Sequence, residues 1–238
     1  MMVPHRTSLT RTILCLLAAA GLPTAAGAAS QEIKPALPGD TVFGLKLVDW
    51  AEALAQWAVS IPTSVNPRDP TGLYGGVGQR TPVWFIKSAL PNSGTQDYAI
   101  PDGKAILLSV GSLVHESKPG EMTEDQLAVD PTTQADQVAT LEVSLDGVPV
   151  SNPKQYRVRT PVFNITIPPN NVFGESVSTV EDERRAAVTD GYWFLFPPLP
   201  VGHHVLTRHV AGTTIDGIAY DTRGTFNLNI EKPNEASQ

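Results

Sequence analysis

Arginine and tyrosine side chains in the third quarter of the chain have the spacing best suited to binding chemistry. Arg157 and Arg159 alternate with Tyr156 and Val158, so a β-strand here would place both guanidinium groups on one face, about 7 Å apart. Guanidinium groups bind carboxylates through paired hydrogen bonds, and this separation would suit an acidic polymer. A solvated sheet face with acidic partners on neighbouring strands explains the same pattern and is the favoured interpretation.

Three histidines lie further along the chain and raise the question of metal binding. In a strand, His203 and His209 would share one face but lie about 20 Å apart, which is too far to hold one metal ion. His204 would point to the other face, and we expect it to hydrogen-bond the turn that enters its strand. The acidic segment 116–136 lacks the regular spacing of a calcium loop. We therefore predict no metal site, and nothing in the sequence calls for a cofactor.

Signatures of catalysis are equally sparse. Serine, histidine and aspartate are all present, but no G-x-S-x-G sequence marks a nucleophile elbow. A pair of glycosidase carboxylates stays open, because the separation of such a pair depends on the fold. In an enzyme acting on an acidic polysaccharide, Arg157 and Arg159 would neutralise a uronate carboxylate. A tyrosine or histidine would then move the proton, the candidates being Tyr156, Tyr192, His204 and His209.

The N-terminus has the pattern of a secretory signal peptide. Arg6 and Arg11 precede a short apolar run, Ile13–Leu22, and the small residues Ala26–Ala28 form a cleavage site. A helix that crosses a bilayer takes about 20 apolar residues, so a run of about ten is a signal and not an anchor. We therefore expect a periplasmic or secreted protein from which residues 1–28 are removed.

Charge and cysteine content narrow the range of partners. The formal net charge is −7, and the single cysteine, Cys15, lies in the predicted signal peptide. Cleavage would leave a more acidic chain that has neither a disulfide nor a thiolate ligand. Nucleic-acid backbones attract surfaces rich in lysine and arginine, so we do not expect this domain to bind them. The same negative charge disfavours docking onto anionic lipid.

One helix and a series of short strands make up the expected fold. Residues 45–60 place Leu47, Trp50, Leu54 and Trp57 at helical spacing, which predicts an amphipathic helix packed on a larger surface. From residue 82 the chain alternates between apolar runs and proline- or glycine-rich turns. The bulky run 192–196 is expected to be a central strand, covered on both faces.

These elements predict a mainly β protein: an antiparallel two-layer sandwich, of jelly-roll or immunoglobulin-like type, with one N-terminal helix packed on it. Two further helical segments are expected. A capping box at Thr123 and Gln126 would open a short helix that Pro131 closes, and residues 181–188 would form a helical turn. The predicted division is a flexible leader (29–44), a single domain (45–231, in which 138–231 could be a subdomain) and a disordered tail (232–238).

Five short motifs are spread through the predicted mature chain: Trp50-x6-Trp57, Gly78-Gln79-x-x-Pro82-Val83-Trp84-Phe85, Pro101-x-Gly103-Lys104-Ala105, Asp190-Gly191-Tyr192-Trp193 and Pro198-Leu199-x-x-Gly202-x-His204. Together they resemble a family of uncharacterised exported bacterial proteins. The resemblance brings no function with it. Members of that family place cysteines near the positions of Tyr74 and Tyr98 and an asparagine in the strand matching 106–113. This chain has neither cysteine, and that strand carries serine and glycine.

Three functional hypotheses follow. The leading one is a non-catalytic binding domain for a carbohydrate or a component of the cell envelope, since every catalytic signature fails and sandwich folds host many binding functions. The candidate ligand-binding residues are Arg157, Arg159, Tyr156, Tyr192, His204 and His209. The alternatives are a lyase or hydrolase acting on an acidic glycan, and a structural envelope protein without a ligand.

Overall fold

The computed structural model describes residues 33–69, 71–87, 94–174 and 183–232. The predicted signal peptide and the tail from residue 233 lie outside the described residues. In the part of the chain that is described, no helix is long and apolar enough to cross a membrane.

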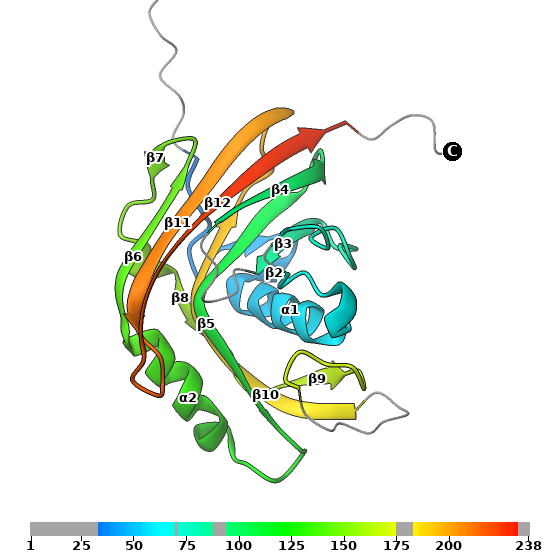
Figure 1. The fold of residues 1–238 in the computed structure, drawn as a ribbon, viewed down its shortest axis with the longest axis vertical. Coiled ribbons are helices and arrows are strands. Elements are labelled where there is room, and N and C mark those ends of the chain that lie inside the picture. The colour runs from blue at the N-terminus through cyan, green and yellow to red at the C-terminus, as the bar shows by residue number, and fades with distance from the viewer. Residues whose placement is uncertain (1–32, 70, 88–93, 175–182, 233–238) are drawn as a thin grey trace, which may run out of the picture. The chain divides into compact units, whose positions relative to one another are not determined.

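Two mixed sheets, called sheet I and sheet II here, form the two layers of the domain (Figure 1). Sheet I has the order β3-β5-β10-β8, with β9 also paired to β10, and contains β3 (Val83–Lys87), β5 (Ala105–Ser117), β8 (Arg157–Arg159), β9 (Phe163–Ile167) and β10 (Glu183–Phe196). Sheet II has the order β4-β12-β11-β6-β7 and contains β4 (Gly94–Pro101), β6 (Val138–Leu145), β7 (Val148–Pro149), β11 (Gly202–Thr213) and β12 (Ala219–Glu231). The prediction of a mainly β, layered domain is confirmed.

Strand pairing is not uniformly antiparallel. In each sheet one edge strand pairs in parallel with its neighbour: β3 with β5 in sheet I, and β4 with β12 in sheet II. The other strand pairs of the two sheets are antiparallel. Because β4 lies between β3 and β5 in the sequence, the chain crosses from sheet I to sheet II and back. A parallel pair needs such a crossover, which a search for short hairpins does not detect.

The centre of sheet I is buried on both faces, as the run of bulky residues predicts. In β10, Phe194 and Phe196 belong to the core between the two sheets, whereas Trp193 and Leu195 face the opposite side of sheet I. All four side chains are fully buried. Alternation along one strand thus supplies side chains to two separate cores.

The predicted N-terminal helix covers this second face of sheet I (Figure 1). It is α1 (Leu47–Ser60), and the predicted stripe is buried. The indole nitrogen of Trp50 donates a hydrogen bond to the carbonyl of Val42 at 2.9 Å, and that of Trp57 donates to Val77 at 2.8 Å. Part of the predicted leader also contacts the domain, since the short strands β1 (Thr41–Val42) and β2 (Leu45–Lys46) pair just before α1.

Two predictions about helical segments are wrong. Helix α2 (Glu124–Asp136) begins at the predicted capping box but continues through Pro131, because its buried face packs on β5 and β10. That burial outweighs the loss of one backbone hydrogen bond. Residues 183–188, expected in a helical turn, begin β10 instead, where Ala187 and Val188 are buried on opposite faces.

Candidate functional site

A pocket of about 290 Å³ lies between α1 and sheet I. Most of its walls are apolar, and its polar lining residues are two cations and a serine. The apolar lining residues are Ala55, Ala58, Val59, Leu113, Val114, Val172 and Phe173; the polar ones are Arg68, Lys87 and Ser112. Small apolar cavities with a few convergent polar groups are the usual form of a ligand site.

Lys87 and two serines form a hydrogen-bonded group at this pocket, which we call the Lys87 cluster. The ammonium nitrogen of Lys87 lies 2.8 Å from the hydroxyl of Ser112 and 3.5 Å from that of Ser109. The two serine hydroxyls are 2.5 Å apart. Ser109 is almost fully buried, whereas Ser112 lines the pocket. Ser112 is therefore the hydroxyl that a ligand would meet.

A β-bulge brings the two serines onto the same face of sheet I. The parallel register pairs Lys87 with Ser109, and the neighbours of Ser109 at positions 105 and 107 pack against α1. Strict alternation would turn Ser112 to the opposite face. The register of β5 and β10 shifts between Asp190 and Tyr192, however, and this restores Ser112 to the α1 face. Bulges often re-aim a side chain next to a functional site.

Two glycines make this bulge sterically possible. Gly111 has φ of 58°, a left-handed conformation that glycine adopts without a Cβ clash. Opposite it, a Cβ on Gly191 would lie 2.4 Å from Cβ and 2.5 Å from Cα of Ser112. The backbones of β5 and β10 therefore approach more closely at the bulge than any other residue at position 191 would permit.

The electrostatics of the pocket favour an uncharged lysine. Burial, with a smaller contribution from repulsion by Arg68, lowers the pKa of Lys87 to about 7. Among the described residues, the side chains that bond Lys87 are hydroxyls, and no carboxylate forms an ion pair with it. A lysine amine that is free at neutral pH can act as a base or a nucleophile.

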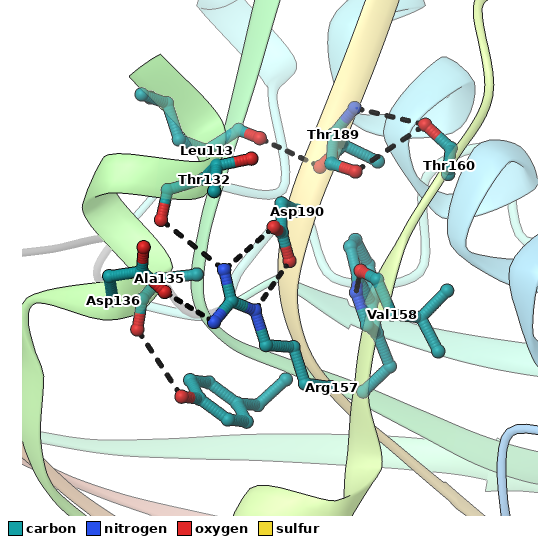
Figure 2. Close-up of polar contacts among 11 residues, drawn as sticks. Leu113, Thr132, Ala135, Asp136, Arg157, Val158, Thr160, Thr189 and Asp190 are labelled. Carbon is teal, nitrogen blue, oxygen red and sulfur yellow. Dashed lines mark hydrogen bonds and ion pairs between the residues drawn. The ribbon is translucent and has the colours of Figure 1, made fainter. Parts of the chain in front are cut away.

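The predicted residues Arg157 and Tyr192 are cross-strand neighbours on the other face of the same bulge. Figure 2 shows the polar contacts of Arg157. The guanidinium of Arg157 donates to both carboxylate oxygens of Asp190, at 2.9 and 3.1 Å, and to Asp136 of α2 at 2.6 Å. It also donates to the carbonyl of Thr132. The hydroxyl of Tyr192 donates to the carbonyl of Ala135 at 3.2 Å.

These contacts, called the Arg157 cluster below, attach α2 to sheet I. Hydrogen bonding to Asp190 raises the pKa of Arg157 above its usual value, so the guanidinium is always charged. The carboxylates of Asp190 and Asp136 already neutralise that charge. The neighbouring candidates do not join this group. Arg159 is exposed on β8, and Tyr156 is buried between the sheets with its ring centroid 5.3 Å from that of Phe194.

The predicted histidines lie in sheet II, in two separate places. His204 bonds the carbonyl of Pro200 at 2.9 Å, which confirms the expected contact with the turn before its strand, and its other ring nitrogen lies 2.7 Å from Asp146. His209 lies 2.9 Å from Asp221 and 3.1 Å from Glu142. Among the described residues, no group of three or more histidine, cysteine, aspartate or glutamate side chains is placed to hold a metal ion.

A shallow groove of about 560 Å³ runs over the part of sheet II that contains His209. Its lining comes from β6, β7, β11 and β12. It includes Val143, Pro149, Arg208 and Gly224 together with the hydroxyl or charged residues Glu142, Ser144, Thr207, His209, Arg223 and Thr225. The structure thus distributes the six predicted residues among the Arg157 cluster, the core, the surface of β8 and two places on sheet II.

The sequence reasoning missed the Lys87 cluster. Two signals were available. A lysine ends the otherwise apolar run of β3, and the strand interior around Ser109 and Ser112 contains a glycine, which often marks a bulge. Comparison of the chain with protein-family models, with curated proteins and with solved structures gives no match.

Proposed function

We propose that this chain is an exported binding domain whose pocket beneath α1 takes a small ligand with an anionic head and an apolar body. One observation carries the proposal: Lys87 and Arg68 line a cavity whose other walls are almost entirely apolar. A carboxylate is the simplest head group, because both cations bind carboxylates through charge-assisted hydrogen bonds. Export rests on the N-terminal signal pattern.

The pocket would bind such a ligand with uptake of a proton. An anion next to Lys87 favours its charged form and so raises its pKa above the value of about 7 in the free protein. The hydroxyl of Ser112 supplies a further donor. The small side chains of Ala55 and Ala58 on α1 leave room for the apolar body.

Thermal unfolding with a series of straight-chain carboxylates, from propionate to octanoate, tests this proposal. We expect at least one member to raise the melting temperature by several degrees, since saturating a ligand at about 100 times its Kd adds about 2.7 kcal/mol. Matched primary alcohols should have little effect. Lys87→Met should abolish the shift, and the control Lys118→Met, at an exposed position that does not line the pocket, should retain it. No shift with any carboxylate would overturn the proposal.

A second candidate is binding of a carbohydrate or envelope glycan on the groove of sheet II. The observation that favours it is the row of hydroxyl side chains at Ser144, Thr207 and Thr225, flanked by His209 and Arg223. A glycan array with the wild type and a Thr207→Ala, His209→Ala double variant tests it. Loss of a glycan signal in the double variant would support this groove, and the absence of any signal would remove it.

The structure supports the enzyme and structural-protein hypotheses less than it supports the two binding hypotheses. An enzyme acting on uronate polymers draws no support from Arg157, because its guanidinium is already bonded to Asp190 and Asp136. A structural envelope protein without a ligand is the interpretation that would remain if both binding experiments were negative.

A further inference from the structure

We propose that Ser112 is a nucleophile activated by Lys87, and that the pocket beneath α1 hydrolyses carboxylic esters with a short apolar acyl group. This goes beyond the binding function and shares only its pocket. The geometry that points to it is a hydroxyl at the pocket wall, a lysine amine in hydrogen-bond contact with it, and a second hydroxyl behind both.

The distances match those of a nucleophile and its base. A base must lie within about 2.6–3.2 Å of the hydroxyl that it deprotonates, and Lys87 Nζ lies 2.8 Å from Ser112 Oγ. A third group usually orients such a pair. Ser109 Oγ, 2.5 Å from Ser112 Oγ and 3.5 Å from Lys87 Nζ, occupies that place. Because Ser109 is 1% exposed, it is a positioning residue, and Ser112 is the group that meets the substrate.

The protonation state of Lys87 suits the role of base. With a pKa of about 7, a substantial fraction of the amine is unprotonated at neutral pH and can accept the proton of Ser112. Arg68 is the only other charged side chain among the described residues that line this pocket. On the α1 side the lining residues are Ala55, Ala58 and Val59, which carry no charge.

The reaction balances without a further reagent. Ser112 Oγ attacks the ester carbonyl carbon while its proton passes to Lys87, and the carbon–oxygen bond to the alcohol then breaks as Lys87 returns that proton to the leaving oxygen. The acyl group is left on Ser112. Water attacks this acyl-enzyme with Lys87 again as base, and Ser112 leaves with the proton. The sum is ester plus water giving carboxylic acid plus alcohol.

The walls restrict the substrate. An acyl group that enters from the pocket meets Val172, Phe173 and the alanines of α1, so it should be short and apolar. A neighbouring hollow of about 370 Å³ shares Arg68 and Val172 with this pocket, and its lining is more polar, including Thr63, Asn66, Asp69 and Tyr74. It is placed to receive the alcohol part of the ester.

Two measurements on the processed protein test the proposal: hydrolysis of p-nitrophenyl propionate and butyrate, and labelling by a fluorophosphonate followed by peptide mass mapping. We expect the adduct on Ser112 and a hydrolysis rate that rises with pH through about pH 7. Ser112→Ala should lower the rate at least 100-fold and abolish the adduct. Lys87→Met should lower the rate about 100-fold or more, and Ser109→Ala should lower it about tenfold.

The controls keep a loss of folding apart from a loss of chemistry. Ser117→Ala removes another buried hydroxyl from the same strand and should leave the rate unchanged. Ser112→Ala retains the Cβ that packs against Gly191, and Ser112→Cys should again be labelled, now through sulfur with iodoacetamide. An adduct on Lys87 or elsewhere, or full activity in Ser112→Ala, would overturn the proposal.

The two proposals for the pocket fail separately. If carboxylates raise the melting temperature but Ser112 is never labelled, the nucleophile is refuted and the binding function stands. If Ser112 is labelled and turns over ester while no carboxylate stabilises the protein, the nucleophile stands and the anion-binding function is refuted.

Discussion

The Lys87 cluster and the Arg157 cluster lie on opposite faces of the same bulge between β5 and β10, yet their charges are balanced in opposite ways. Arg157 bonds two carboxylates, one of them buried, and a backbone carbonyl. Lys87 bonds two hydroxyls and faces a second cation. One irregularity in a sheet thus positions a neutralised guanidinium on one face and, on the other, a lysine whose pKa is lowered to about 7.

This difference separates an attachment from a site. A charge with all its hydrogen bonds satisfied by permanent partners holds elements together, as Arg157 holds α2 against sheet I. A lysine in an apolar pocket without a carboxylate partner is costly to keep charged, and nothing in the folding of the sheet calls for it there. Perturbed groups of that kind concentrate at functional sites. The four changes below test the contrast, beginning with the largest expected effect.

Gly191→Ala should disrupt both clusters together. The new Cβ would lie 2.4 Å from Cβ and 2.5 Å from Cα of Ser112, so the two central strands of sheet I would have to separate. We expect a loss of about 4 kcal/mol or more, seen as a fall of about 10 °C in melting temperature. Gly94→Ala is the matched control, because a Cβ there meets nothing within 4 Å; equal effects of the two changes would contradict the proposed close approach.

Asp190→Ala should damage the Arg157 cluster alone. It removes the buried carboxylate and leaves Arg157 with the exposed Asp136 as its ionic partner. Breaking a buried pair in this way costs about 3–5 kcal/mol, and the partial exposure of Arg157 reduces our expectation to about 2–4 kcal/mol. Urea unfolding measures it. A loss below 0.5 kcal/mol would mean that this pair does not attach α2.

Lys87→Met should stabilise the protein at pH 6. The pKa of Lys87 is lowered by burial to about 7, whereas an unfolded lysine titrates near 10.4, so between these values the unfolded state binds more protons. Stability of the wild type therefore rises with pH across that window. The variant lacks this dependence but also loses the hydrogen bonds of Lys87 to Ser109 and Ser112. Its net advantage, about 1–3 kcal/mol at pH 6, should shrink towards pH 10. Chemical unfolding of the wild type and the variant at several pH values measures this. A difference in unfolding free energy that stays constant from pH 6 to pH 10 would contradict the prediction.

Arg223→Ala should have the smallest effect. Arg223 pairs with Asp221 at 3.0 Å on the surface of sheet II, where both side chains are more than half exposed. Exposed pairs contribute about 0–1 kcal/mol, so we expect a change within about 0.5 kcal/mol by urea unfolding. If the loss were as large as that of Asp190→Ala, the exposed pair would stabilise the fold as much as the pair with a buried carboxylate, and the distinction between them would fail.

Features with a local cause could be predicted from the sequence. The stripe from Leu47 to Trp57 repeats at helical spacing, and its burial follows from that spacing alone. The bulky run 192–196 requires cover on both faces wherever it lies. Asp146 and Gly147 both adopt positive φ in the β6–β7 hairpin, as their sequence implies.

Features that depend on distant parts of the chain could not. Pro131 stays inside α2 because β5 and β10 bury that face of the helix. Neither the residues next to Pro131 nor its low helix propensity indicates this packing. The Lys87 cluster needs the parallel register of β3 and β5. It also needs a bulge that is sterically possible only with glycine at position 191, about 80 residues beyond Ser112 in the chain. Alternation read from β5 alone would separate Ser109 from Ser112.

The most direct test of the contrast is the titration of Lys87 itself. In a sample with ¹⁵Nζ- and ¹³Cε-labelled lysine, the resonance that disappears in Lys87→Met can be followed from pH 5 to pH 11. We predict a midpoint near pH 7 for this lysine. A midpoint near pH 10.4, the value of an exposed lysine, would show that Lys87 is as well solvated as the surface lysines and would contradict the assignment of the pocket as a site.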